Sequence, residues 1–163
     1  MNGKAMFAGS FDPITLGHVN IIERSAKLFK KVYVVVAENK EKKCLFSTEE
    51  RVFLVRDAVK HLENVKVVSY SGLMVDYARA NGIGIMIRGV RGLSDFSYEF
   101  ELAMNNKMIL PDIETLFLPT EASFFLLRSS QIKEMASYGA DISTMVTKEV
   151  EKALKGKFGK DKK

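Results

Sequence analysis

Apolar runs alternate with segments of helical periodicity along most of the chain. Five short runs, several of them rich in β-branched residues, predict strands over residues 4–10, 32–37, 65–70, 83–89 and 115–120. The run VYVVVA at 32–37 is apolar at every position, which is typical of a strand buried on both faces. Since helical segments separate the strands, we expect an α/β fold with a single-domain, doubly wound, five-stranded parallel sheet.

Several of the expected helices carry recognisable end signals. Thr15 can cap the first helix, and Ser47 with Glu50 forms a capping-box pattern at the start of the second. Apolar positions at helical spacing give these two helices an inner face: Val19, Ile22, Ala26 and Phe29, then Val52, Val55, Val59 and Leu62. The helices after the first are expected over 46–62, 73–82, Ser94 or Asp95 to about 108, 129–139 and 147–156. Gly82 and Gly139 are placed to end two of them.

The unusual polar residues follow strands rather than precede them. In doubly wound sheets, ligands bind beyond the carboxyl ends of the strands, where the strand order reverses. The residues in question come after each strand in turn: Gly9-Ser10 and His18, then Lys40, Lys42 and Lys43, then Ser71-Gly72, then Arg88 and Arg91, then Ser129-Ser130. The sequence therefore predicts one site built from five strand ends.

This predicted site is rich in cations and hydrogen-bond donors, which suits phosphate groups. His18 and Ser129-Ser130 each fall near a predicted helix start, where free N–H groups favour an anion. The segment RGVRG at 88–92 has glycines that permit close backbone approach to a ligand, although a solvated loop with salt-bridged arginines fits it equally well. The chain has no GxxxxGK[ST] loop and no GxGxxG after its first strand, which argues against P-loop kinases and ordinary dinucleotide binders.

Composition and charge narrow the class of protein and the partners that we expect. The 163 residues suit one domain, which we place at 1–155, followed by a basic tail over 156–163. Most of the formal charge of +5 comes from five lysines after residue 154, so we expect no nucleic-acid partner. One cysteine, no signal-peptide anatomy and no long apolar run predict a cytoplasmic protein without a membrane partner. Two histidines and one cysteine give no standard zinc spacing, so we expect no protein-held metal.

Three motifs together resemble the phosphopantetheine adenylyltransferase family of coenzyme A biosynthesis. They are GSFDPITLGH near the start, RGVR followed by DFSYE at 95–99, and the late SSQIKE at 129–134. The TxGH element alone would indicate only the nucleotidylyltransferase superfamily, but the combination with Leu73-Met74 at these spacings is more specific. The resemblance extends from about residue 4 to 152 and implies a Rossmann-like nucleotidylyltransferase fold.

The resemblance implies adenylyl transfer from ATP to 4'-phosphopantetheine, giving dephospho-coenzyme A and pyrophosphate. It implies that His18 stabilises the transition state, that Mg²⁺ arrives with ATP, and that the assembly is a homohexamer. It also implies that dephospho-coenzyme A and coenzyme A bind as product or inhibitor. The implied ATP-binding residues are Ser10, Phe11, His18, Gly89, Val90, Arg91, Glu99, Phe124, Phe125, Leu126, Leu127, Arg128, Ser129 and Ser130. The implied acceptor-binding residues are Ser10, Lys42, Leu73, Met74 and Arg88.

The chain also departs from the family pattern. Arg128 stands where the family usually has the first of three serines, so its role is left open. Lys40 and Lys43 compete with Lys42 for the acceptor phosphate. Two other functions are consistent with parts of the pattern: a nucleotidylyltransferase for another acceptor, such as nicotinate mononucleotide or a phosphoalcohol with CTP, and a non-catalytic nucleotide-binding protein. The aromatic residues Phe96, Tyr98 and Phe100 are expected in the core or at an oligomer contact.

Overall fold

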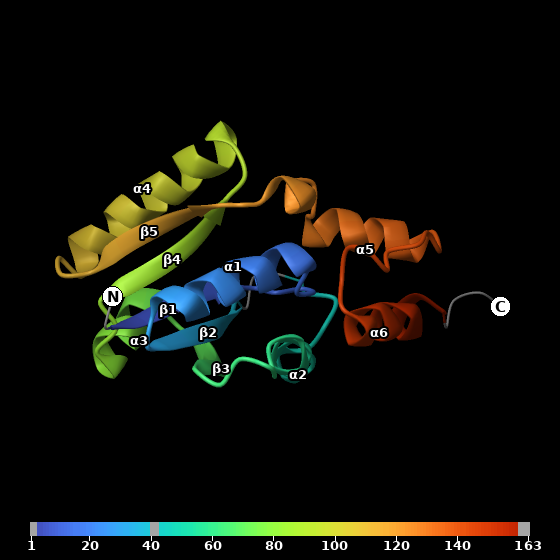
Figure 1. Cartoon of the computed structure of the whole chain (residues 1–163), viewed down its shortest axis with the longest axis horizontal. Helices are drawn as coiled ribbons and strands as arrows, with labels where there is room; N and C mark the ends of the chain where they lie inside the picture. The colour runs from blue at the N-terminus through green and yellow to red at the C-terminus, as the bar shows by residue number, and fades with distance from the viewer. Residues whose placement is uncertain (1–2, 40–42, 160–163) are drawn as a thin grey trace.

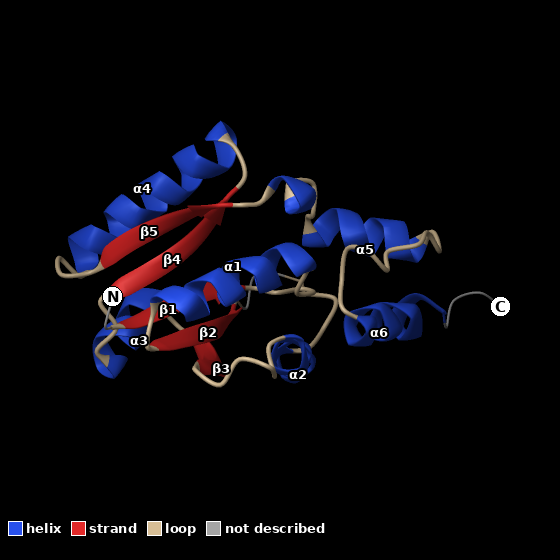
Figure 2. Cartoon of the chain, in the orientation of Figure 1, coloured by secondary structure: helices blue, strands red, loops and turns tan. Residues whose placement is uncertain are grey.

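All five predicted strands are present in the computed structural model, which describes residues 3–39 and 43–159. They are β1 (Lys4–Gly9), β2 (Lys31–Glu38), β3 (Val65–Ser71), β4 (Ile85–Val90) and β5 (Glu114–Pro119). The strands form one parallel sheet in the order β3-β2-β1-β4-β5. The prediction of a doubly wound, five-stranded parallel α/β sheet is therefore confirmed (Figures 1 and 2).

The helices connect these strands and cover both faces of the sheet. They are α1 (Leu16–Leu28), α2 (Thr48–Ala58), α3 (Met74–Asn81), α4 (Leu93–Ile109), the short 3₁₀ helix η1 (Ala122–Phe124), α5 (Ser129–Ser137) and α6 (Lys148–Phe158). One core cluster joins α1, α2, α5 and α6 to the sheet, and the other joins α3 to its opposite face. Helix α4 lies along β4 and β5, and α5 and α6 lie side by side beyond the far end of the sheet (Figure 1).

Strand β2 is apolar at nearly every position because the sheet is covered on both faces. Val34 and Val36 belong to the cluster with α1 and α2, whereas Val35 belongs to the cluster with α3. Successive side chains of a strand point to opposite faces, so a strand in the middle layer needs apolar residues at every position. All three valines are fully buried.

The strand order places a topological switch point beside β1. The chain passes from β1 through β2 to β3 on one side, and then returns to β4 on the other side of β1. Connections from β1 and β4 therefore leave in opposite directions at the carboxyl ends of these strands. A crevice forms at such a point, and ligands of doubly wound folds bind there.

Some predicted helix ends are wrong, for physical reasons that the structure makes clear. Ser94 and Asp95 do not cap α4, because the helix begins at Leu93 with Gly92 as its N-cap and no side-chain cap. Asp95 instead binds the side chain of Arg91. Helix α2 is shorter than predicted, although the predicted Ser47–Glu50 capping box is present. Helix η1 is not anticipated by the sequence pattern.

No helix in the described ranges combines enough length and apolarity to span a bilayer.

Candidate active site

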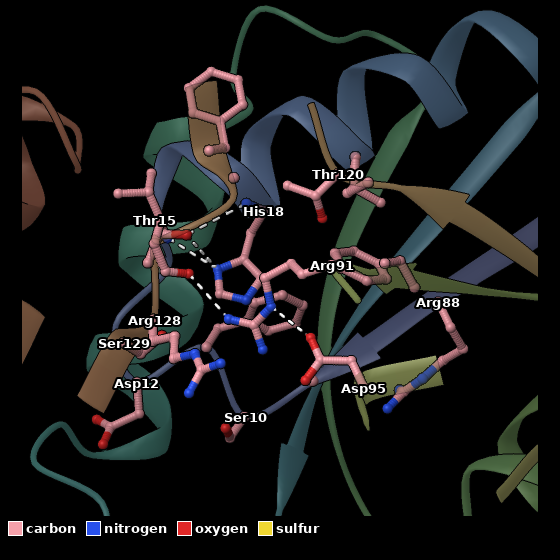
Figure 3. A pocket seen from close by; sticks show the side chains of 18 of the residues that line it. Ser10, Asp12, Thr15, His18, Arg88, Arg91, Asp95, Thr120, Arg128 and Ser129 are labelled. Carbon is pink, nitrogen blue, oxygen red and sulfur yellow. Dashed lines mark hydrogen bonds and ion pairs between the residues drawn. The ribbon is translucent and has the colours of Figure 1, made fainter. Parts of the chain in front are cut away.

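A cleft of about 530 Å³ opens where the carboxyl ends of β1 and β4 diverge (Figure 3). Segments from five parts of the chain line it: the end of β1 and the start of α1, the end of β4, α4, Thr120, and the stretch from η1 to α5. Most of the residues singled out in the sequence meet here: Ser10, Phe11, His18, Arg88, Gly89, Arg91, Glu99, Phe124, Leu127, Arg128, Ser129 and Ser130. We call this the first cleft.

A second cleft of about 390 Å³ adjoins the first on the α3 side of the sheet. Leu73 and Met74 line it, together with residues of β4 and α4 such as Met86 and Leu102. The two clefts share Ala8, Arg88 and Glu99 as lining residues. A ligand in one cleft would therefore approach a ligand in the other near Arg88.

The loop between β1 and α1 holds Phe11 in a strained backbone conformation. Its φ angle is 45°, which is in the left-handed region that costs a non-glycine residue about 1–2 kcal/mol. The ring is buried and packs edge-to-face on His18 and on Phe7, with centroids 5.3 and 5.5 Å away. Packing of the Phe11 ring thus compensates for the backbone strain. It also holds the loop in place and covers one side of the His18 imidazole.

His18 is the third residue of α1, and its side chain helps to cap the helix. Thr15 is the N-cap, as predicted, and its side chain accepts a hydrogen bond from the backbone N–H of His18. In return, His18 Nδ1 accepts the backbone N–H of Thr15 at 3.0 Å. Since Nδ1 is an acceptor, a neutral imidazole carries its proton on Nε2, which remains able to donate to a ligand.

The imidazole of His18 is held neutral by its surroundings. Burial lowers its pKa from 6.5 to about 4, and the nearby positive charge of Arg91 acts in the same direction. Figure 3 shows the Arg91 guanidinium close to the imidazole. At neutral pH, His18 is therefore a hydrogen-bond donor through Nε2 and not a cation.

A titration of His18 in the free protein tests this assignment. We expect ¹⁵N NMR to report the Nε2–H tautomer at pH 7 and a second ring proton only near pH 4. Because the folded-state pKa is lower than the unfolded one, the unfolded chain binds more protons below about pH 6.5. The contribution of His18 to stability is therefore complete above that pH and decreases as the pH falls toward 4. A midpoint near 6.5 would contradict the assignment.

Two arginines of β4 and its following loop bind carboxylates of α4. Arg88 forms a bidentate ion pair with Glu99 and donates to the carbonyl of Ala8 at 3.0 Å. Arg91 donates to Asp95 at 2.6 Å and to the carbonyl of Leu127 at 3.4 Å. The arginines thus form the salt bridges that one alternative for RGVRG expects, and they also line the first cleft, where ligand binding stays a prediction.

The two glycines of this segment have different surroundings. A Cβ on Gly89 would lie 3.3 Å from Ile21 of α1, so its lack of a side chain serves helix packing as well as the cleft. A Cβ on Gly92 would meet no atom within 4 Å. Gly92 instead serves as the N-cap of α4.

The start of α5 forms the opposite side of the first cleft. Ser129 is its first helical residue, and its hydroxyl donates to the carbonyl of Pro13 at 2.8 Å. Arg128 is the N-cap residue without a side-chain cap, and its exposed side chain lines the cleft. The N-termini of α1 and α5 therefore both lie at the first cleft, where the helix dipoles favour an anion. In α1, the amides of Leu16 and His18 are already bound by Met145 and Thr15.

Some of the implied site residues lie elsewhere. Val90 lines neither cleft, and its carbonyl accepts the backbone N–H of Thr120. Phe125 and Leu126 are exposed and border a smaller hollow next to Arg91 and Gln131. Lys42 and Lys40 fall outside the described residues, and Lys43 is exposed.

Three charged residues near the site were not singled out in the sequence. Asp12 is buried, and its carboxylate accepts hydrogen bonds from Lys133 and from two backbone amides. Arg51 is buried on the inner face of α2 and donates to the carbonyls of Ser10 and Ala37. The sequence could have indicated Asp12 and Lys133, because Asp12 lies within GSFDPITLGH and Lys133 within SSQIKE. A charge at an inner position of an apolar helix face could have drawn attention to Arg51.

The comparisons with known proteins agree with this fold. The model of the cytidylyltransferase-like family matches residues 6–135, so the chain belongs to this family of nucleotidyltransferases. A solved structure provisionally described as a nicotinate-nucleotide adenylyltransferase from Vibrio parahaemolyticus is 21% identical in sequence and has a TM-score of 0.69. The alignment covers 95% of this chain and 92% of that one. At this level of identity the match establishes the shared Rossmann-like nucleotidylyltransferase fold.

Proposed function

We propose that the protein transfers the adenylyl group of ATP to 4'-phosphopantetheine, producing dephospho-coenzyme A and pyrophosphate. One observation carries the proposal: a cation-lined cleft of about 530 Å³ and an adjoining cleft of about 390 Å³ share Arg88 as a wall. The first has the charge and helix N-termini that a triphosphate needs. The second is lined mostly by apolar residues, with some polar ones, which suits the uncharged arm of pantetheine and its amides.

The nucleotide would occupy the first cleft. Ser10, Phe11, His18, Gly89, Arg91, Glu99 and the stretch from Phe124 to Ser130 would surround it, and Val90, which lines neither cleft, would contribute only through its backbone. The acceptor would extend along Leu73 and Met74, and its phosphate would lie near Ser10, Arg88 and Lys42. Arg88 and Arg91 would exchange part of their contact with Glu99 and Asp95 for phosphate oxygens, since the arginine fork suits both partners.

The reaction is a direct displacement at the α-phosphorus of ATP. An oxygen of the acceptor phosphate attacks this phosphorus, the bond to the β-phosphate oxygen breaks, and pyrophosphate leaves with the electron pair. The attacking phosphate is already ionised at neutral pH, so no general base is required. His18 Nε2–H would donate to a non-bridging oxygen of the α-phosphate as charge develops there, and catalysis would rest on positioning and charge stabilisation.

Magnesium would arrive with ATP and be held by phosphate and water. The carboxylates that line the first cleft are each already bound to a cation: Asp12 to Lys133, Asp95 to Arg91 and Glu99 to Arg88. Among residues 3–39 and 43–159, no group of three His, Cys, Asp or Glu side chains could hold a metal. This donor set fits a substrate-borne ion, which is how Mg²⁺ commonly binds in nucleotide sites.

The test is to incubate the purified protein with ATP, Mg²⁺ and 4'-phosphopantetheine, and to measure pyrophosphate and dephospho-coenzyme A. We expect both products in equal amounts. The second candidate is adenylyl transfer to nicotinate mononucleotide, favoured by the similarity to the Vibrio structure. Activity with that acceptor alone would replace the proposal. Binding of ATP without transfer to either acceptor would favour a non-catalytic nucleotide-binding protein.

We also propose that copies of this chain associate through α4, in line with the homohexamer that the resemblance implies. None of the 17 residues of α4 is buried in the single chain. Its apolar residues Leu93 and Met108 are 86% and 81% exposed, and Tyr98 and Met104 are also exposed. A helix with an apolar face normally buries that face against a partner.

Light scattering coupled to size exclusion tests this association. We expect a mass six times that of one chain, and a smaller species for the Leu93→Lys/Met108→Lys variant. The Phe53→Lys variant is the control, because Phe53 is exposed and apolar but lies on α2. A monomeric wild-type protein would contradict the proposed assembly.

A further inference from the structure

The loop that precedes α1 is bound to three other parts of the site by a few polar contacts. Asp12 is only 3% exposed, yet three donors reach its carboxylate. The backbone amides of Leu45 and Phe46 donate to its two oxygens, each at 3.0 Å. Lys133 Nζ donates to one of these oxygens at 2.6 Å.

These donors belong to segments with different proposed tasks. Lys133 is on α5, one turn after Ser129 and Ser130, which line the first cleft at the helix start. Leu45 and Phe46 follow the lysine-rich stretch that would contact the acceptor phosphate. The carboxylate of Asp12 therefore lies between the segment proposed to bind the triphosphate and a segment next to the acceptor-binding lysines.

Further contacts strengthen the connection on both sides. The hydroxyl of Ser129 donates to the carbonyl of Pro13, so α5 binds this loop at two neighbouring residues. The buried guanidinium of Arg51 donates to the carbonyl of Ser10 at 2.7 Å and to that of Ala37 at 3.0 Å. Arg51 thus links Ser10 to Ala37, before the lysine-rich stretch, while Asp12 binds the chain that follows this stretch.

The chemistry of Asp12 favours a permanent charge. Burial alone would raise the pKa of this carboxyl group, but the hydrogen bond from Lys133 and the two amides hold it below its ordinary value. An ionised, fully hydrogen-bonded carboxylate in a buried place is held in one geometry, because moving away would leave a charge unpaired.

We propose that Asp12 and Lys133 are positioning residues that couple the ATP site to the acceptor-binding segment. The inference rests on the proposed function. Phosphates held at the start of α5 restrain Lys133, Lys133 restrains Asp12, and Asp12 restrains the chain at Leu45 and Phe46. Bound ATP thereby restrains the chain at Leu45 and Phe46, which follow the proposed acceptor-binding lysines in the sequence.

Hydrogen exchange at the Leu45 and Phe46 amides reports this coupling without requiring turnover. Each amide must leave Asp12 before it exchanges. With saturating Mg²⁺ and α,β-methylene-ATP, we expect exchange at both amides to slow by about fivefold or more in the wild-type protein, the lower end of typical couplings. In Lys133→Met, saturated with the same analogue, we expect little change, and Lys133→Arg should restore most of the effect.

The controls separate this role from general stability. Lys60→Met removes another lysine–aspartate pair, the exposed one with Asp57, and should leave the wild-type response intact. Asp12→Asn should speed exchange at Leu45 and Phe46 with or without the analogue. If Asp12→Asn does not fold, the two Lys133 variants still decide the question.

The outcomes distinguish this inference from the proposed function. Calorimetry with the analogue establishes binding first, and failure of the wild-type protein to bind it would overturn both. Binding without a change at Leu45 and Phe46, or with faster exchange because Lys133 has moved to a phosphate, would overturn the coupling alone. A wild-type response that persists in Lys133→Met would also overturn it.

Discussion

Replacing His18 with alanine should lower kcat by a hundredfold or more while the protein still binds ATP. The side chain offers one neutral N–H donor, fixed by Thr15 through Nδ1 and by the ring of Phe11 on one side. Preorganised donors of this kind contribute about 3 kcal/mol to a transition state when charge develops at their acceptor. Steady-state kinetics with both substrates saturating, beside calorimetry with ATP, measures the effect.

Two variants make the result for His18 interpretable. His18→Ala also removes one half of the capping box, so His18→Gln is the matched variant, since glutamine is a standard third residue in such caps. It should recover most of the stability without recovering the wild-type kcat. His61→Ala is the second control, because His61 is an exposed histidine that pairs with Glu23. Nearly unchanged kcat in His18→Ala would contradict the role of the imidazole.

Arg51→Met should destabilise the protein by about 2–4 kcal/mol, because it leaves two carbonyl groups without their donor. Arg51 is 4% exposed and binds the carbonyls of Ser10 and Ala37, together with the hydroxyl of Thr48. The buried Nε of Arg51 has no acceptor within the described ranges. Methionine removes this unsatisfied N–H, which offsets part of the loss of stability. Thermal and denaturant unfolding should both report the loss, with a melting temperature lower by roughly 10 °C.

Arg56→Met is the control for Arg51. Arg56 is on the same helix, but it is exposed and makes one hydrogen bond, at 3.3 Å, to the carbonyl of Val67. Its replacement should change stability by less than about 1 kcal/mol. Equal effects of the two replacements would show that Arg51 contributes only as an ordinary helix residue.

Apolar patterning predicted the fold well because the sheet is buried on both faces. Runs such as 32–37 must be continuously apolar to fill both core clusters, so they identify strands without tertiary information. The rule that ligands bind beyond strand ends then placed Ser10, His18, Arg88, Arg91 and Ser129 in one region. The structure does bring these residues to one cleft.

The missed features depend on contacts between distant parts of the chain. Arg51 is one of several charged residues in its helix, and its contacts with the carbonyls of Ser10 and Ala37 arise only in the folded chain. Asp95 resembles a helix cap by local rules, but an ion pair with Arg91 takes its carboxylate. The pairing of Asp12 with Lys133 spans 121 residues, which no local pattern encodes.

The shared wall between the two clefts has a consequence for inhibitors. Ala8 and the Arg88–Glu99 pair line both the 530 Å³ and the 390 Å³ spaces. Two weakly binding fragments, one in each space, could be joined by a short linker passing Arg88. Joining them makes the second binding event intramolecular, and effective concentrations for short linkers reach the millimolar range. A small anionic group in the linker would find Arg88 as its counter-ion, and would add selectivity against proteins that have only one of the two spaces.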